Sequence, residues 1–414
     1  MLPILNIDQA QALITRKSMR LAEAEKIVAP ILEQVRKRGD EALFEYGRKF
    51  DQLAVNDVRV SEPDFANAAS RVAADFVAAM EIASINIREY AQFQMPREHF
   101  VTLPDGRRLG QIVRPLESMG AYIPAGRYPL PSTLLMTVIP AQVAGVKTIC
   151  VASPHPSVEI LAGARFLKVG NVFRMGGAQA VAALAFGTAT VPRVDRIVGP
   201  GNIYVSAAKK LLAGEVAIDF VAGPTEIVII AAEGDPRHIA ADMLAQAEHD
   251  TDASAILLTT SKRLAELVTL EVSRQLETLP TAGVACEAIR KNSAVILVGS
   301  LEEAAEISNR LAPEHLALHD ADLLPLIQHA GSIFLGSNSP EAAGDYASGP
   351  NHVLPTAGAA RIRGGLSAAD FVKVISVQEL TPRGLAQLAP AVTTLARAEG
   401  LEAHARSVEV RLGA

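Results

Sequence analysis

Two segments of the chain place histidine beside amide or carboxylate side chains, the residue types that bind metals and transfer protons. In Gln246-Ala-Glu-His249-Asp250, a helix starting at Asp235-Pro236 would put Gln246 and His249 three residues apart on one face. An amide oxygen and an imidazole nitrogen suit zinc, but such a pair is also common as a hydrogen-bonded pair in a core. The spacing alone is therefore weak evidence for a metal.

A second segment joins Glu314 and His315 directly after Pro313. Because proline ends the preceding helix, the pair begins a new segment. In an extended segment the two side chains point to opposite sides, so they could transfer protons to different atoms of one substrate. An ordinary surface pair is the alternative interpretation.

Two further segments carry histidines near carboxylates. Asp345 and His352 lie in a glycine-rich stretch after an apolar run at 332–335, which indicates a site loop at the carboxyl edge of a sheet. Glu399 and His404 lie near the C-terminus, where a solvated helix is the competing interpretation. Together these segments offer four candidate metal ligands with nitrogen or oxygen atoms and no sulfur: Gln246, His249, Asp345 and His404. Zinc accepts such ligands, although their spacing in the sequence cannot show that they converge.

Two glycine-containing segments could approach an anion. Gly176-Gly-Ala-Gln179 opens an alanine-rich helix, and Gly199-Pro-Gly-Asn202 follows an apolar run. Free N–H groups at a helix start favour anions. Neither segment has the glycine spacing of a dinucleotide fingerprint or a phosphate loop, so these residues alone indicate nucleotide binding only weakly.

The elements that must position these residues change in type along the chain. The first 100 residues have helical periodicity, over 22–48 and 63–90. Beyond residue 110, short apolar runs alternate with helical segments, once before and once after about residue 225, which predicts two α/β units with parallel sheets. The expected strands are 148–152, 195–198, 227–231, 255–259, 294–298 and 332–335, and a strand-like run ends the chain at 408–412.

Composition narrows the function classes. The 414 residues carry 39 Lys+Arg and 45 Asp+Glu, so no basic excess suggests a nucleic-acid partner. Residues 128–146 are uncharged, but three prolines predict a loop and a buried helix, not a membrane span. The N-terminal apolar run is too short for a signal peptide, and two cysteines, Cys150 and Cys286, fit a reducing compartment. We therefore expect a cytoplasmic protein without membrane partners.

Taken in order, eight motifs resemble histidinol dehydrogenase over most of the chain. The series is Gly120-Ala-Tyr-Ile-Pro124, Pro129-Leu-Pro-Ser-Thr133, Gly176-Gly-Ala-Gln-Ala180, Gly199-Pro-Gly-Asn-Ile-Tyr204, Ala222-Gly-Pro-Thr-Glu226, Gln246-Ala-Glu-His-Asp250, Pro313-Glu-His315 and Gly344-Asp345 through Pro355.

The resemblance implies an architecture of two incomplete Rossmann-like domains with parallel sheets, plus small N- and C-terminal helical pieces, in an intertwined homodimer. On this basis we expect four parts. They are an N-terminal piece at 1–20, a metal-carrying domain at 21–121 and 228–368, an NAD-binding domain at 122–227, and a C-terminal part at 369–414 that reaches the partner subunit.

The resemblance also implies zinc-dependent oxidation of L-histidinol through L-histidinal to L-histidine, with two NAD+ reduced, as the last step of histidine biosynthesis. It implies His315 as acid/base and Glu314 as the residue that activates water. One Zn2+ per subunit would be bound by Gln246, His249, Asp345 and His404, with His404 shared across the dimer. NAD would contact Tyr122, Gln179 and Asn202. Substrate contacts would come from Thr225, Gln246, His249, Glu314, His315, Asp345, His352, Glu399 and His404.

The implied chemistry suits these residue types. The imidazole and amine of histidinol are good zinc ligands when neutral, and a histidine with a pKa near neutrality can remove the hydroxyl proton. Two positions depart from the family pattern: Thr225 stands where serine is more frequent, and Ala125 where glycine is frequent. These departures leave the substrate contact and the loop conformation open.

Three other functions are compatible with parts of this pattern. A related dehydrogenase could act on another small amino or sulfonated alcohol, although the acidic, histidine-lined pocket favours an imidazole-bearing substrate. A zinc hydrolase could use Glu314 and His315 to activate water without NAD. A catalytically silent paralogue would be expected to lack one of the ligands or acid/base residues, and none is missing.

Overall fold

The computed structural model describes residues 2–14, 21–125 and 128–413, so part of the expected N-terminal piece, residues 15–20, lies outside the described residues. The chain forms two compact units. Unit 1 comprises Met1–Gln94 and Glu117–Phe371, and unit 2 comprises Met95–Leu116 and Val372–Ala414. The residues with candidate chemistry divide between the two units, and each unit is described by itself.

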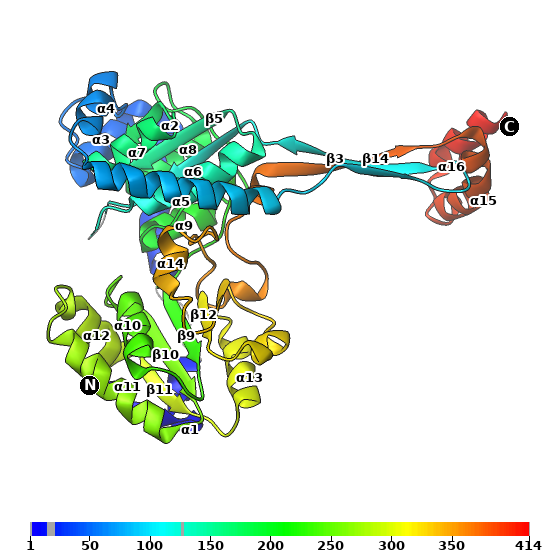
Figure 1. Ribbon diagram of the computed structural model, residues 1–414. Coiled ribbons are helices and arrows are strands. Elements are labelled where there is room, and N and C mark those ends of the chain that lie inside the picture. Colours follow the sequence, from blue (N-terminus) through cyan, green and yellow to red (C-terminus); the bar gives the residue numbers. More distant parts are fainter. Residues whose placement is uncertain (1, 15–20, 126–127, 414) are drawn as a thin grey trace. The chain divides into compact units, whose positions relative to one another are not determined.

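One half of unit 1 is built on a six-stranded parallel sheet, which lies between α10 (Pro236–Ala247) and α13 (Leu301–Leu311) in Figure 1. Its strands, in spatial order, are β1 (Ile4–Asn6), β11 (Ala294–Leu297), β10 (Ser254–Thr259), β9 (Glu226–Ile230), β12 (His315–Leu318) and β13 (Ser332–Leu335).

Helices cover this sheet on both faces. Ile227 and Ile229 of β9 pack with α10 (Pro236–Ala247), α11 (Lys262–Leu276) and α12 (Ala282–Asn292). Val228 and Ile230 of the same strand pack with α1 (Ile7–Ile14), α13 (Leu301–Leu311) and the 3-10 helix η1 (Ala321–Leu326). Alternate residues of the strand thus enter different cores, which explains its continuous apolar sequence.

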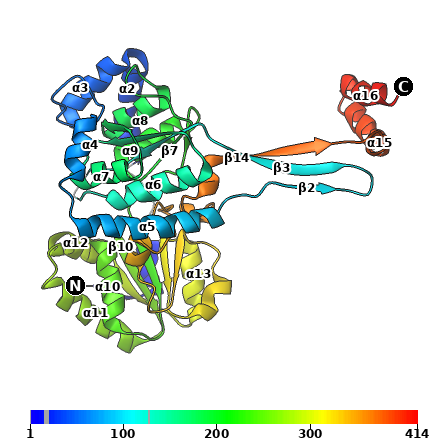
Figure 2. The same ribbon diagram turned by 45° about the horizontal axis from the view of Figure 1, so that its top comes forward.

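The other half of unit 1 is built on a five-stranded parallel sheet. Its order is β6 (Asn171–Arg174), β5 (Thr148–Ser153), β4 (Ser118–Tyr122), β7 (Arg196–Val198) and β8 (Ala217–Ile218). One core joins it to α2 (Leu21–Arg38), α3 (Asp40–Phe50), α8 (Gly177–Phe186) and α9 (Ile203–Leu212). Figure 2 shows two further helix pairs. Helix α5 (Ala74–Phe93) packs on α6 (Pro131–Ala144), and α4 (Glu62–Ala69) packs on α7 (Val158–Phe166).

The predicted α/β class with two parallel-sheet domains is confirmed, but the packing differs from the expected division of the chain. The helices at 21–93 and strand β4 belong with the five-stranded sheet, whereas 21–121 was expected in the metal-carrying domain. Residues 4–14 supply β1 and α1 to the six-stranded half. Helical periodicity fixes which face of a helix is buried, but it does not identify the sheet that receives that face.

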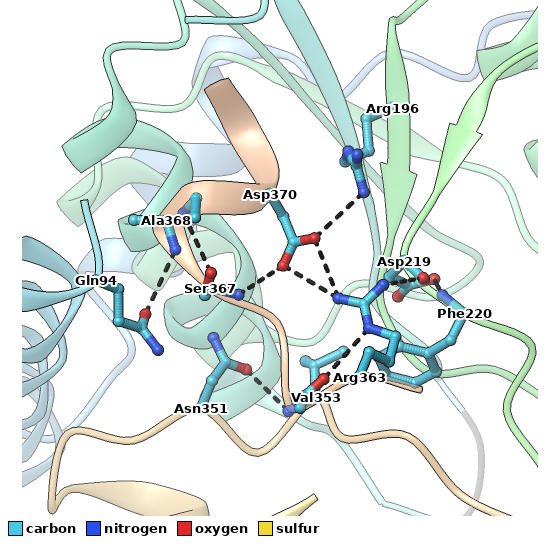
Figure 3. A network of polar contacts seen from close by, with 12 residues as sticks. Gln94, Arg196, Asp219, Phe220, Asn351, Val353, Arg363, Ser367, Ala368 and Asp370 are labelled. Atoms are coloured by element: carbon cyan, nitrogen blue, oxygen red, sulfur yellow. Dashed lines mark hydrogen bonds and ion pairs between the residues drawn. The ribbon is translucent and has the colours of Figure 1, made fainter. Parts of the chain in front are cut away.

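A polar network attaches residues 351–371 to the five-stranded half (Figure 3). The Arg363 guanidinium donates to both Asp370 oxygens at 3.1 Å and also to the Asp219 carbonyl, and Asp370 lies 3.6 Å from Arg196. The Asn351 amide donates to the Met136 carbonyl at 2.6 Å. This segment includes the 3-10 helices η2 (Ala359–Arg361) and η3 (Ala368–Phe371), and it links α14 (Glu341–Tyr346) to the second sheet.

Unit 2 contains an antiparallel sheet of β2 (His99–Thr102), β3 (Arg108–Pro115) and β14 (Val372–Glu379), followed by α15 (Pro382–Ala398) and α16 (Glu402–Glu409). The strand expected at 408–412 is wrong: these residues end α16 and form the 3-10 helix η4 (Val410–Leu412), which packs on α16. The loop and buried helix expected at 128–146 are confirmed by α6. Among the described helices, none has the length and apolar character needed to cross a membrane.

Candidate active site

The residues with acid/base and ligand chemistry gather at the amino edge of the six-stranded sheet. Strand β12 begins at His315, opposite Ile227 of β9, and both strands run in the same direction. Because α10 connects β9 to the next parallel strand, it runs back against them and returns Gln246 to the edge where Thr225 precedes β9. The expected carboxyl-edge location of the Asp345 loop is therefore wrong: α14 brings Asp345 to within 3.5 Å of His315 at the amino edge.

Four buried side chains and one exposed side chain form the cluster. Gln246 is 0%, Glu341 2%, His315 3% and Asp345 9% exposed, whereas the His249 side chain is 43% exposed and its Nε2 lies 3.9 Å from Asp345 Oδ2. Ligand atoms of His249, Glu341 and Asp345 all lie within 4.8 Å of one another. Three of the four ligands implied by the resemblance thus meet within unit 1.

Sequence reasoning missed Glu341. It lies four residues before Asp345 at the start of α14, so the two carboxylates share one side of this short helix. The i, i+4 spacing of two acids was a signal that could have identified it. The buried position of Glu341 could not be read from the chain, because its polar neighbours His315 and Gln246 come from β12 and α10.

The Gln246 amide can be oriented in two ways, and each has a different requirement. With its nitrogen toward Glu341, it donates to Oε1 at 2.8 Å, to Oε2 at 3.2 Å and to His315 Nδ1 at 3.1 Å, while its oxygen accepts from the Thr225 hydroxyl at 2.6 Å. With its nitrogen toward Thr225 Oγ1, its oxygen faces these same acceptors. That second orientation is satisfied only when a proton or a cation lies between the facing oxygens.

The acid/base pair is anchored at the starts of β9 and β12. Glu314 Oε2 accepts from the Thr225 hydroxyl at 2.5 Å and from the Glu226 N–H at 3.0 Å. His315 Nδ1 lies 3.3 Å from the Glu226 carbonyl and 3.7 Å from Glu314 Oε2. The two side chains were expected on opposite sides of an extended segment. They instead approach each other because Glu314 precedes the strand that begins at His315.

His315 Nε2 is the free end of this pair: it is buried and has no hydrogen-bond partner among the described residues. Burial alone would lower the pKa of His315, but the carboxylates of Glu341, Glu314 and Asp345 together raise it to about 10. Burial, followed by the charge of Glu314, raises the pKa of Glu226 to about 8. Burial also raises the pKa of Glu314 and brings that of Glu341 to about 8. The site therefore holds more carboxylates than it can ionise without added positive charge.

This donor set fits a borderline divalent cation such as zinc. It offers an amide oxygen, an imidazole and carboxylates, without sulfur. The unpartnered His315 Nε2 is one buried polar atom of the cluster that no described residue satisfies.

His352 connects the cluster to the other half of unit 1. Its Nδ1 lies 2.7 Å from the Asp345 carbonyl and its Nε2 lies 3.1 Å from the Thr133 hydroxyl at the start of α6. Both ring nitrogens are therefore engaged, and burial lowers the pKa of the imidazole. A neutral His352 can hold the backbone of Asp345 in place.

The glycine-containing segments lie at the carboxyl edge of the five-stranded sheet. Tyr122 ends β4, and its hydroxyl accepts from the Gly177 N–H at 3.1 Å. Gln179 is 1% exposed, and its amide donates to Asp51 at 3.0 Å. Asn202 caps α9 by accepting from the N–H groups of the next turn. The residues expected to contact NAD thus lie at the ends of the strands and the starts of the following helices.

Asp51 is a second residue that sequence reasoning missed. It follows α3, and besides Gln179 it binds the Gly176 N–H at 2.9 Å. Asp51 also lines a cavity of 470 Å³ with Pro154, His155 and Arg174. An acid between two helices carries no distinguishing pattern, so nothing in the sequence marked it.

Glu399 and His404 belong to unit 2. Glu399 caps the end of α15 and His404 lies in the first turn of α16; both are exposed in this single chain. The structure therefore assembles the predicted site residues of unit 1, and it assigns Glu399 and His404 to unit 2.

Comparison with known proteins defines the family. A family profile described as histidinol dehydrogenase matches residues 14–412. Histidinol dehydrogenase from Geobacter metallireducens is 48% identical over 97% of this chain and 94% of its own length. Histidinol dehydrogenase from Gluconobacter oxydans is also 48% identical, over 98% of this chain and 96% of its own length. The crystal structure of histidinol dehydrogenase from Elizabethkingia anophelis superposes with a TM-score of 0.95 at 38% identity, covering 100% of this chain and 98% of that one.

The two parallel sheets form two Rossmann-like halves. The acid/base and ligand residues at the amino edge of one sheet and the helix starts at the carboxyl edge of the other are those of a dehydrogenase. With these relatives, the chain belongs to the histidinol dehydrogenase family, a family of NAD-dependent oxidoreductases of histidine biosynthesis. An acetylating aldehyde dehydrogenase from Geobacillus thermoglucosidasius, at 14% identity and a TM-score of 0.50, shares the fold only.

Proposed function

We propose that this protein oxidises L-histidinol through L-histidinal to L-histidine and reduces two NAD+ in the process. The observation that carries the proposal is the meeting of Gln246, His249, Glu314, His315 and Asp345 at one sheet edge in a member of this family. Acid/base groups and ligand groups then act on one bound molecule.

We propose one zinc ion per site, held by Gln246, His249 and Asp345, with His404 of the partner subunit in a homodimer. The metal would orient the imidazole and amine of the substrate and polarise its oxygen. The exposure of His404 and Glu399 in the single chain supports a role for both on another subunit. Glu399, His352 and Thr225 are proposed as further substrate contacts.

The residues of the chain then have separate tasks in the two oxidations. A divalent cation among the carboxylates would offset the negative charge that raises the pKa of His315, so that a neutral His315 accepts at Nε2 the proton of the substrate hydroxyl as hydride leaves for NAD+. Glu314, 3.7 Å from His315, takes a proton from water as it adds to the aldehyde and later releases it to solvent, while His315 returns its own proton to the aldehyde oxygen and becomes neutral again. His315 then accepts a proton from the hydrate as the second hydride leaves. Thr225 and the Glu226 N–H hold the Glu314 carboxylate for this step.

NAD is proposed to bind at the carboxyl edge of the five-stranded sheet, against Tyr122, Gln179 and Asn202. The N-terminal ends of α8 and α9 carry the positive ends of the helix dipoles, which favour an anionic pyrophosphate. The buried Gln179 would act through its amide edge, which Asp51 holds in place.

Counting NADH tests the function directly. Complete consumption of a limiting amount of L-histidinol should yield two NADH per substrate, and L-histidine as the product. One NADH would indicate a simple alcohol dehydrogenase. Turnover only with another amino alcohol would indicate the related dehydrogenase, and hydrolysis of an ester or amide without NAD would indicate the hydrolase.

A further inference from the structure

The cluster at the amino edge contains a buried carboxylate, that of Glu341, to which the proposed function assigns no task. Glu341 precedes Asp345 by one helical turn on α14 and is 2% exposed. We propose that Glu341 is a second anionic member of the metal site, whose carboxylate fixes the Gln246 amide and balances the charge of a divalent cation. The identity of the cation rests on the proposed function.

Contacts place Glu341 in the centre of the cluster. Its Oε1 lies 2.8 Å from the Gln246 amide and 3.7 Å from His315 Nδ1. A carboxylate oxygen of Glu341 also lies within 4.8 Å of ligand atoms of His249 and Asp345. The carboxylate therefore contacts a proposed ligand and the proposed base, and it can act on the metal through both.

Charge is the physical reason for a second acid. Gln246 and the neutral imidazoles carry no charge, so Asp345 alone would leave a divalent cation with an excess positive charge in a buried site. Such an excess is costly in a low dielectric. For the described residues, the ion-pair contacts of Glu341 and Asp345 are with histidines, not with lysine or arginine. The carboxylate of Glu341 is thus available to complete the neutralisation.

One unpartnered group points to a ligand at this place. His315 Nε2 is buried without a hydrogen bond and lies 3.5 Å from Asp345 Oδ1. A buried ring nitrogen of this kind is rare in a folded protein unless a ligand satisfies it. It distinguishes the cluster from an accidental gathering of acids.

The test is zinc affinity, measured on the full-length protein by competition with a chromophoric chelator. Glu341→Gln keeps the size of the side chain and removes its charge, so it is expected to weaken zinc binding at least about tenfold. Its melting temperature should stay close to that of the wild type. Glu248→Gln is the matched control: it lies beside His249, but its carboxylate accepts from Thr281 at 2.6 Å, and its zinc affinity should stay within about twofold.

A Glu341→Gln protein that binds zinc as tightly as the wild type overturns the inference. A double-mutant cycle tests the coupling through the amide: in a Gln246→Ala background, Glu341→Gln should have a smaller effect than it has alone. Equal effects in both backgrounds would show that Glu341 does not act through Gln246.

Glu341→Asp separates charge from packing and serves if Glu341→Gln does not fold. It retains the charge, so its zinc affinity should stay within about threefold of the wild type. A loss of tenfold or more would assign the role to packing and overturn the inference. If the wild type binds zinc and yields two NADH, but Glu341→Gln has unchanged zinc affinity, this inference is wrong and the proposed function stands. A wild type without zinc binding removes the proposed metal as well.

Discussion

The two halves of unit 1 share a parallel-sheet construction but use opposite edges of their sheets. At the six-stranded sheet, side chains before β9 and β12 meet residues from α10 and α14 at the amino edge. At the five-stranded sheet, Tyr122 and the segments after β6 and β7 lie at the carboxyl edge, as is usual for ligands of parallel sheets.

The edges also differ in chemistry. The amino edge gathers three buried carboxylates and His315, whose ionisation states depend on one another. The carboxyl edge offers mainly backbone N–H groups, a buried tyrosine and a buried amide. The first suits proton transfer and metal binding, and the second suits a large anion. Substitutions at one edge should therefore leave the function of the other intact, and the following experiments test that separation.

The largest effect is expected from His315→Asn. Loss of the proposed base should lower kcat for L-histidinol by about 10²–10⁴-fold, the usual range for general acid–base catalysis. Zinc content, measured by atomic absorption, and NAD affinity should not change. His319→Asn is the control because His319 follows the other end of the same strand. Loss of zinc from His315→Asn, or an equal loss of activity in the control, would contradict the assignment.

Much of the fold, but less of the site, could be predicted from the sequence. Strands such as β5, β10 and β11 were predicted because near-continuous apolar runs are typical of strands buried on both faces. The antiparallel strands of unit 2 were missed: β2 is exposed along its length, so it has no apolar face to reveal its period. The edge used by Asp345 was predicted wrongly because a six-residue helix, too short to be recognised, redirects the chain after β13.

The ligand and acid/base residues of unit 1 were identified from motifs, whereas Glu341 and Asp51 were not. Each of these two acids contacts a residue that is distant in sequence. Glu341 contacts Gln246, 95 residues away, and Asp51 contacts Gln179, 128 residues away. Sequence spacing reports neighbours on one element and cannot report such pairs.

A pH-dependent stability of the amino edge is the next largest effect. Because burial raises the pKa of Glu226 to about 8, the folded state keeps this carboxyl protonated where the unfolded chain, near 4.5, has lost its proton. Its stabilising effect is therefore complete below pH 4.5 and is lost as pH rises to about 8. Urea unfolding of chelator-treated protein should show a decline in unfolding free energy on the order of a few kcal/mol.

Glu226→Gln isolates this contribution because the amide cannot ionise. The decline between pH 5 and pH 8 should be smaller in the variant than in the wild type. Identical slopes in the two proteins would mean that Glu226 does not titrate in this range.

At the carboxyl edge, Gly199→Ala should weaken NAD binding and stability together. Gly199 has φ +112°, and an added Cβ would lie 2.2 Å from the Tyr122 carbonyl oxygen, so the loop before Asn202 must move. A cost of about 1–3 kcal/mol is expected in urea unfolding, with a raised KM for NAD and unchanged zinc affinity. Gly214→Ala is the control because its Cβ would meet open space. Altered zinc affinity would show that the two edges are coupled.

Asp51→Asn should give the smallest effect and the sharpest test of separation. Oδ2 of Asp51 accepts both hydrogen bonds, from the Gly176 N–H and the Gln179 amide, so an asparagine oxygen in the same place keeps both bonds but lacks the charge that strengthens them. Weakening of these bonds by about 1 kcal/mol in total should raise the KM for NAD several-fold while kcat at saturating NAD stays within twofold. Asp40→Asn, at the other end of α3, should leave KM unchanged. A fall in kcat with constant KM would instead connect Asp51 to the chemical step, and the division of labour between the two edges would fail.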